Sequence, residues 1–351
     1  MSDLEVATGR WACASAGVRV RPMDSTRLGR TGLKVSRLCL GTMTFGLQCD
    51  EPTSRAILDA AAAGGISFID TADAYPLGGS TETVGRTEEI VGRWLRGRRH
   101  EFILATKCHN PMSDRPWDRG NSRKHVLDAI DASLRRLGTD YVDLYQLHMF
   151  DPETPLDESL RALDDVVRAG KARYVGCSNF QAWQVARALG RSEVLGTVRF
   201  DSVQPRYNLL FRELERELFP LCAQEGIGVI PYNPLAGGVL SGKHRATGPA
   251  PSGRFTLGTA GQMYQDRYWH DREFATLEQL RPLAAEAGLD LVTVAVAWVM
   301  ANPVVTSPIV GASRPEQLGA ALAAAAVKLA PELKARLDAL TAEYRRGDAV
   351  R

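Results

Sequence analysis

The chain has 351 residues, of which 44% are hydrophobic, so it can bury a large core, and its length is normal for an α/β barrel. Its 43 basic and 41 acidic residues are mixed throughout and give a net charge of +2, which provides no basis for binding nucleic acid or an anionic membrane. No run approaches the roughly 20 apolar residues that a membrane span needs. We therefore expect neither nucleic acid nor a membrane as a partner.

The cysteines show no CxxC pair and no histidine at metal-ligand spacing, so we predict no metal site, reduced thiols and a cytoplasmic location. They are Cys13, Cys39, Cys49, Cys108, Cys177 and Cys222. Residues 1–23 contain arginines and small residues without a continuous apolar segment, which argues against a signal peptide. We expect 1–23 to be an extension, disordered or preceding a true start at Met23, and 24–351 to be a single barrel domain.

Short apolar strands alternate with helical segments along the chain after an expected hairpin over 25–36. The predicted strands cover residues 37–40, 66–70, 102–107, 141–148, 173–177, 202–204, 228–232 and 307–310. The predicted helices cover residues 53–64, 83–95, 121–138, 156–169, 182–189, 213–224, 273–287, 292–300, 315–326 and 331–344. Hydroxyls at Thr53 and Ser54 suit the start of the first helix, and residues 244–270 are expected to form a long polar loop.

This alternation predicts right-handed crossovers and a parallel sheet. Eight units in a chain of this length favour closure into a (β/α)8 TIM barrel over an open sheet. A doubly wound dinucleotide fold would need GxGxxG after an early strand, and the sequence has none there. The predicted fold is therefore a TIM barrel with an N-terminal β-hairpin and extra C-terminal helices.

Four reactive side chains fall at or after the carboxyl ends of three neighbouring predicted strands, where such barrels build their active sites. Asp70 ends the second strand and Tyr75 follows it, while Lys107 and His148 end the third and fourth. Each of these residue types is common at a strand end for structural reasons alone. Their convergence on one rim is what favours a catalytic site.

Carbonyl reduction explains this set, because the alkoxide that hydride transfer forms must take up a proton. Tyr75 can donate that proton, and a Lys107 ammonium is expected to lower its pKa from about 10. Asp70 would keep the lysine charged and oriented. His148 could hydrogen-bond the carbonyl oxygen and align it for the hydride.

Several ordered motifs match one family over essentially all of residues 24–351. They are FIDTA at 68–72, SLRRLGTDYVDLY at 133–145, GKARYVGCSNF at 170–180 and VGASR at 310–314. With these motifs the chain resembles the aldo-keto reductases, most of all the branch of bacterial general-stress reductases and potassium-channel β-subunits. The resemblance implies a barrel closed at its bottom by the hairpin, NADP(H) extended across the top, and the four residues above as catalytic tetrad.

The resemblance also implies the cofactor contacts. The implied cofactor-binding residues are Thr42, Met43, Asp70, Ser178, Asn179, Gln204, Tyr232, Asn233, Pro234, Leu235, Ala236, Lys243, Gly311, Ser313, Arg314 and Gln317. Among them, Tyr232 would stack on the nicotinamide, and Arg314 would meet the adenosine 2′-phosphate. Many relatives carry Glu-Asn where this chain has Ala320 and Ala321, so fewer adenine contacts are expected here.

We therefore expect an NADPH-dependent reductase of an aldehyde or ketone, with a small-molecule carbonyl partner and homo-oligomerisation left open. The alternatives are a cofactor-binding regulatory subunit with little turnover, a ketosugar reductase of a deoxysugar pathway, and a non-redox barrel enzyme such as a lyase. The expected substrate-pocket side chains are Met43, Phe45, Trp117, Met149, Phe150, Tyr264, Tyr268 and Trp269.

Overall fold

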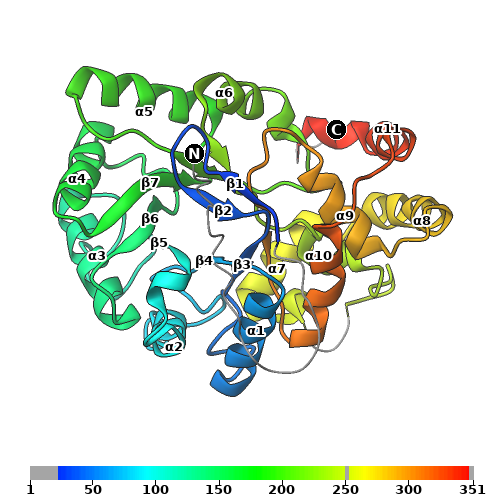
Figure 1. Cartoon of the computed structure of the whole chain (residues 1–351), viewed down its shortest axis with the longest axis horizontal. Coiled ribbons are helices and arrows are strands. Elements are labelled where there is room, and N and C mark those ends of the chain that lie inside the picture. The colour runs from blue at the N-terminus through cyan, green and yellow to red at the C-terminus, as the bar shows by residue number, and fades with distance from the viewer. Residues whose placement is uncertain (1–22, 250–252, 348–351) are drawn as a thin grey trace, which may run out of the picture.

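Eight parallel strands form a sheet that curls into a barrel in the computed structural model, which describes residues 23–249 and 253–347 (Figure 1). In spatial order the strands are β10 (Ile309–Val310), β3 (Cys39–Gly41), β4 (Phe68–Asp70), β5 (Ile103–Cys108), β6 (Val142–Leu147), β7 (Ala172–Ser178), β8 (Ser202–Gln204) and β9 (Gly228–Val229). The ends of the sheet meet because Thr306 N–H donates to Val229 O at 2.8 Å and Ile309 N–H donates to Pro231 O at 2.8 Å. The predicted (β/α)8 barrel is confirmed.

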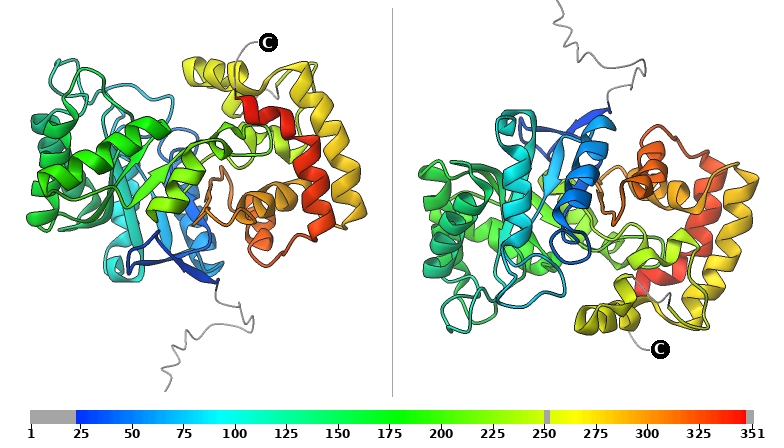
Figure 2. Two further views of the ribbon diagram at one scale, coloured as in Figure 1. Left: turned by 90° about the horizontal axis from the view of Figure 1, so that it is seen from above. Right: turned by 90° about the horizontal axis from the view of Figure 1, so that it is seen from below.

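Helices surround the strands. The α-helices are α1 (Glu51–Ala63), α2 (Arg86–Leu95), α3 (Arg123–Leu137), α4 (Leu156–Arg168), α5 (Ala182–Leu195), α6 (Leu218–Glu225), α7 (Gly258–Tyr268), α8 (Asp271–Glu286), α9 (Leu291–Met300), α10 (Leu318–Ala324) and α11 (Pro331–Leu340). Short 3-10 helices are η1 (Arg99–Glu101), η2 (Glu213–Glu215), η3 (Ala236–Ser241), η4 (Arg254–Thr256), η5 (Pro315–Gln317) and η6 (Ala342–Arg346). The added helices α8 and α11 lie on the side of the molecule away from α3 and α4 (Figures 1 and 2).

The predicted hairpin closes one end of the barrel (Figure 2). Its strands β1 (Ser25–Arg27) and β2 (Lys34–Ser36) pair antiparallel, and Leu28 and Val35 pack against the side chains inside the barrel. At the turn, Gly29 has φ +55°, and a Cβ there would lie 2.4 Å from Gly226 O. Only glycine permits this close approach between the hairpin and the loop before β9.

Alternation along the strands decides which side chains enter the barrel. Phe68, Ala105 and Leu144 belong to the inner cluster, while their neighbours such as Ile69 and Leu104 belong to the larger core between strands and helices. Two residues further along each strand, the inward positions hold Asp70, Lys107 and Gln146. The inner layer thus changes from apolar to polar at the carboxyl end of the sheet.

The structure differs from the predicted elements at several boundaries, and the predicted helix over 213–224 is divided into η2 and α6. Helix α7 lies within the stretch expected to be a loop, and the first helix begins at Glu51 because Asp50, rather than Thr53 or Ser54, caps it by accepting from Thr53 N–H. Helix α5 runs to Leu195, six residues beyond its predicted end. The predicted extension lies outside the described residues except for Met23, and the division into an extension and one barrel domain stays a prediction.

The described residues contain free cysteines but neither a metal-binding cluster nor a single helix that could span a membrane. Their five cysteines are all free and buried, and they contain no cluster of three or more metal-binding side chains. Across 23–249 and 253–347, no single helix has the length and apolar character to cross a membrane, although α8 and α9 pass that test as a pair bent by 90°.

Candidate active site

Asp70 and Lys107 form a buried ion pair at the carboxyl end of the barrel. Lys107 Nζ donates to Asp70 Oδ2 at 2.6 Å and to Thr71 O at 2.8 Å, and the lysine is fully buried. Burial is the largest single influence and lowers the pKa of Lys107, but the charges and hydrogen bonds of Asp70 and Tyr75 together outweigh it, so that this pKa is raised. Gln204 Nε2 donates to the other carboxylate oxygen at 2.8 Å, and Gln146 Nε2 adds a longer contact at 3.3 Å.

Tyr75 stands beside this pair on the loop after β4. Its hydroxyl lies 3.4 Å from Lys107 Nζ, and the ammonium also lies 4.9 Å from the ring centroid. Burial raises the pKa of the Tyr75 hydroxyl, and Lys107 opposes that rise. The lysine therefore acts in the expected direction, but the expectation of a lowered pKa is wrong because desolvation is the larger effect.

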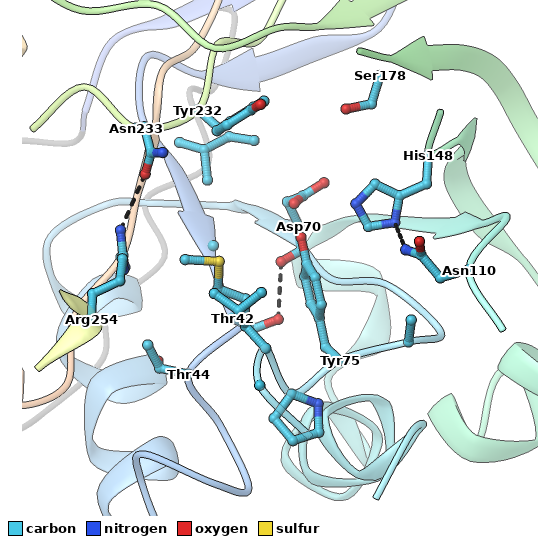
Figure 3. Close-up of a pocket in the computed structure, with 18 of the residues that line it drawn as sticks. Thr42, Thr44, Asp70, Tyr75, Asn110, His148, Ser178, Tyr232, Asn233 and Arg254 are labelled. Atoms are coloured by element: carbon cyan, nitrogen blue, oxygen red, sulfur yellow. Dashed lines mark hydrogen bonds between the residues drawn. The ribbon is translucent and has the colours of Figure 1, made fainter. Parts of the chain in front are cut away.

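His148 faces Tyr75 across the same space, with ring centroids 5.8 Å apart (Figure 3). Burial lowers the pKa of His148 well below its usual range, with a smaller contribution from Lys107, so the ring is neutral. Asn110 Nδ2 lies 3.1 Å from His148 Nδ1. Because an amide nitrogen can only donate, Nδ1 accepts, and the single ring proton is on Nε2.

Asn179 connects the strand ends on the other side of the cavity. It adopts φ +58°, a left-handed conformation that asparagine tolerates better than most residues. Its Nδ2 donates to His148 O at 3.0 Å, and its Oδ1 accepts from the Tyr232 hydroxyl at 2.8 Å. Ser178 Oγ donates to Gln204 O at 2.8 Å. These bonds fix the side of the cavity where the resemblance places the nicotinamide.

A cavity of about 800 Å³ opens over these residues. Of the predicted site residues, those that line it are Thr42, Met43, Asp70, Tyr75, His148, Ser178, Asn179, Gln204, Tyr232, Asn233, Pro234, Leu235 and Gly311. Lys107 lies beneath Asp70 and Tyr75. The predicted residues outside the lining are Ala236, Lys243, Ser313, Arg314 and Gln317.

The expected substrate-pocket side chains divide in the same way. Met43, Met149 and Tyr264 line the cavity. Phe45 and Tyr268 are instead fully buried in the core. The remaining three do not line the cavity either, and they are Trp117, Phe150 and Trp269. The expectation was wrong for these five, because Phe45, Phe150, Tyr268 and Trp269 pack against other side chains and Trp117 is half exposed on the loop after β5.

One end of the cavity is suited to phosphate groups. Arg254 Nη1 donates to Asn233 Oδ1 at 3.1 Å (Figure 3), and both residues line the cavity. Lys243 lies close enough to Arg254 and Arg314 that these two charges, after burial, help lower its pKa. Asn233 Nδ2 is buried and finds no hydrogen-bond partner in the described parts of the chain. Three cations and a free donor at the cavity fit the phosphate groups of a nicotinamide cofactor.

Sequence reasoning missed several polar residues of the site, among them Asn110, Gln146, Arg254 and Arg267. Gln146 could have been found, because it stands two residues before His148 and so points into the barrel as His148 does. The other three lie in the loop after β5 and in the segment around η4 and α7, where no periodicity marks the inward positions.

The barrel fold and the match to a known family together define the class of protein. The model of the aldo/keto reductase family matches residues 37–342, and the chain belongs to that family. Members of this family use nicotinamide cofactors.

Three relatives are similar over nearly their whole length. An uncharacterized oxidoreductase, YrpG of Bacillus subtilis, is 40% identical over 324 residues, covering 90% of this chain and 95% of the relative. A probable voltage-gated potassium channel subunit beta of Arabidopsis thaliana is 37% identical, covering 84% and 89%. Versiconal hemiacetal acetate reductase of Aspergillus parasiticus is 34% identical, covering 88% and 94%.

Proposed function

We propose that this chain reduces an aldehyde or ketone to an alcohol with NADPH, and that Tyr75 supplies the proton. The observation that carries the proposal is the distance of 3.4 Å between the Tyr75 hydroxyl and Lys107 Nζ. The same Nζ donates to Asp70 Oδ2 at 2.6 Å. Both Tyr75 and His148 border the same cavity. A proton donor and a neutral hydrogen-bond donor thus face one space, as reduction of a C=O bond requires.

Each side chain has a separate part in the reaction. His148 Nε2–H donates a hydrogen bond to the substrate oxygen and orients the carbonyl. The Tyr75 hydroxyl donates its proton to that oxygen as negative charge develops on it. Lys107 remains charged beside Asp70 and stabilises the phenolate that is left. The bound cofactor supplies the hydride.

The raised pKa of Tyr75 suits this direction of reaction. A general acid must be protonated before the step, and burial keeps the phenol protonated at neutral pH. The Lys107 ammonium then limits how weak an acid the phenol becomes. Burial therefore keeps the Tyr75 hydroxyl protonated in the resting state. Lys107 provides a cation beside the phenolate that forms when the proton leaves.

NADP(H) rather than NAD(H) is our proposal for the cofactor. Arg314, with Ser313 and Gln317, would hold the 2′-phosphate; Ser313 N–H and Oγ–H donate to Gln317 Oε1 at 2.8 and 3.2 Å. Lys243, Arg254 and Asn233 would hold the pyrophosphate. Tyr232 and the Ser178–Asn179 pair would hold the nicotinamide.

The test is NADPH oxidation, followed at 340 nm, across a panel of aldehydes, ketones and ketosugars. NADPH binding is measured separately by its fluorescence, with NADH as the matched cofactor. We expect stoichiometric binding of NADPH, weaker binding of NADH, and turnover of at least one carbonyl class. A chain that binds no nicotinamide cofactor would refute the proposal and favour a lyase-like barrel.

A second candidate function is a cofactor-binding regulatory subunit, which the similarity to the probable potassium channel subunit beta supports. Tight NADPH binding without turnover of any carbonyl would favour it. Turnover confined to ketosugars would identify a ketosugar reductase. The free, buried cysteines support a reducing cytoplasmic setting for either function.

A further inference from the structure

Charge is unevenly distributed among the side chains that line the cavity. Asp70 is the one acidic residue among the described residues of the lining, and Lys107 already neutralises it. His148 is neutral. Two arginines, Arg254 and Arg267, remain as the charged groups that a ligand can meet. The accessible surface of the cavity is therefore cationic.

The two arginines have different neighbours, although Arg254 also lies 5.2 Å from the centroid of the Tyr264 ring. Arg254 is hydrogen-bonded to Asn233 and affects the pKa of Lys243, which places it at the phosphate end. Arg267 instead affects the pKa of Tyr232, the residue proposed to stack on the nicotinamide. Because Arg267 lies near Tyr232, we do not assign it to the cofactor phosphates, which Arg254 would bind.

Helix α7 carries Arg267 toward the reacting centre. Met263, Tyr264 and Arg267 are spaced by one, three and four residues, which puts them on one face of the helix, and all three line the cavity. Tyr264 is close enough to Tyr75 to contribute to its raised pKa. Arg267 follows Tyr264 by about one helical turn on the same face and lines the same cavity as Tyr75.

Arg267 is also unengaged. It makes no hydrogen bond or ion pair with any residue in 23–249 or 253–347, although many arginines in these ranges pair with a carboxylate or a carbonyl. Its side chain is half-buried. A guanidinium that is partly withdrawn from water and has no anion beside it is a ready site for a carboxylate or a phosphate, which it can bind through two parallel N–H bonds.

We propose that the physiological substrate is an anionic carbonyl compound, whose carboxylate or phosphate group binds Arg267 while its C=O lies between Tyr75 and His148. This proposal rests on the proposed reductase function and names its substrate class. Anion binding by Arg267 would orient the carbonyl and would leave Arg254 for the cofactor. The apolar side chains Met43, Met149 and Met263 would contact the carbon chain between the two ends.

The experiment compares matched substrates that differ in charge. One pair is 4-formylbenzoate and its methyl ester, and a second pair is glyceraldehyde 3-phosphate and glyceraldehyde, so that the carboxylate and the phosphate are distinguished. For Arg267→Gln, we expect the ratio of kcat/KM for the anionic member over the neutral member to fall about 10- to 100-fold in at least one pair. Arg267→Lys should restore part of that ratio.

Two controls separate local recognition from general charge. Arg245→Gln removes an exposed cation from the same region, outside the cavity lining, and should leave the ratio as in the wild type. NADPH titration by fluorescence should give the wild-type Kd for Arg267→Gln and a larger Kd for Arg254→Gln. An unchanged ratio for Arg267→Gln in both pairs would overturn the inference. Loss of NADPH affinity in Arg267→Gln would also overturn it, by assigning this arginine to the cofactor.

Failure of this inference is distinguishable from failure of the proposed function. If the wild-type protein reduces the neutral aldehydes and Arg267→Gln leaves the ratio of kcat/KM values unchanged, only the substrate class is wrong. If it binds no NADPH and reduces neither member of either pair, the reductase function itself is wrong.

Discussion

Lys107 Nζ donates to Asp70 Oδ2 at 2.6 Å in a place where both side chains are almost fully withdrawn from water. Neither charge could remain there alone, because an unpaired ion in the interior loses its hydration without compensation. The strands place the two residues at successive inward positions of β4 and β5, so the backbone holds the pair before any ligand binds. The pair is therefore as much a part of the fold as of the chemistry.

Lys107→Met should destabilise the protein by about 3–5 kcal/mol, because it leaves the Asp70 carboxylate buried without its partner. The double variant Asp70→Asn with Lys107→Met should regain part of that loss. Urea unfolding of wild type, both single variants and the double variant measures the coupling. A double variant whose loss of stability equals the sum of the two single losses would mean that the ion pair has no net coupling.

Tyr75→Phe keeps the ring and removes the hydroxyl. Carbonyl reduction should fall by about 10²- to 10⁴-fold, since the proton donor is lost, while the Kd for NADPH stays near the wild-type value. Single-turnover absorbance measures the first quantity and fluorescence titration measures the second. Full activity in this variant would exclude Tyr75 as the general acid.

Asn110→Leu should release the tautomer of His148, since the donor to Nδ1 is gone. Part of the population would then carry the proton on Nδ1 and present a bare Nε2 to the substrate. We expect kcat/KM to fall roughly tenfold with an unchanged Kd for NADPH. Long-range ¹⁵N–¹H spectra of the histidine ring read the tautomer directly, and a spectrum identical to that of the wild type would contradict the assignment.

Buried neutral histidines make stability depend on pH. Burial lowers the pKa of His125 and of His244 to about 4, and that of His148 well below its usual range. In the unfolded chain these rings titrate near 6.5. Below that pH the unfolded state therefore binds protons that the folded state does not bind. The free energy of unfolding should therefore decrease as pH falls from about 7 to 5.

Urea midpoints between pH 7.5 and 5 measure this decrease. His125→Gln should flatten the dependence, whereas His100→Gln, at an exposed position, serves as the matched control and should leave it unchanged. If His125→Gln and the wild type lose stability equally over this range, His125 is not buried neutral in solution.

The barrel and its strand ends were predictable because the sequence shows the two-residue period of strands and the 3.6-residue period of helices. Asp70, Lys107 and His148 each end an apolar strand, and strand parity alone turns them into the barrel. Gln146 follows from the same rule. The helix caps were less accessible, since Asp50 and Thr53 are both reasonable first residues and only the backbone angles select Asp50.

The segment after β9 was not predictable for a physical reason. Helix α7 contains Gly258 and Gly261, and its buried residues form too short a pattern to distinguish a helix from a polar loop. Its position across the cavity depends on contacts with distant parts of the chain, such as Gly237 against Tyr264. Arg254 and Arg267 reach the cavity only because this segment takes that position, so the sequence alone did not indicate them as site residues.

Because α7 and η4 stand outside the repeating strand–helix units, the arginine proposed to bind the anionic group of the substrate and the residues proposed to perform the chemistry belong to separable pieces of chain. Asp70 and Lys107 are anchored in β4 and β5, whereas Tyr264 and Arg267 come from a single insertion between β9 and α9. Grafting helix α7, residues 258–268, from one relative onto another should therefore exchange substrate range without rebuilding the reaction centre. In such a scaffold, new specificities can arise by replacing one short segment, and the rest of the barrel need not adapt.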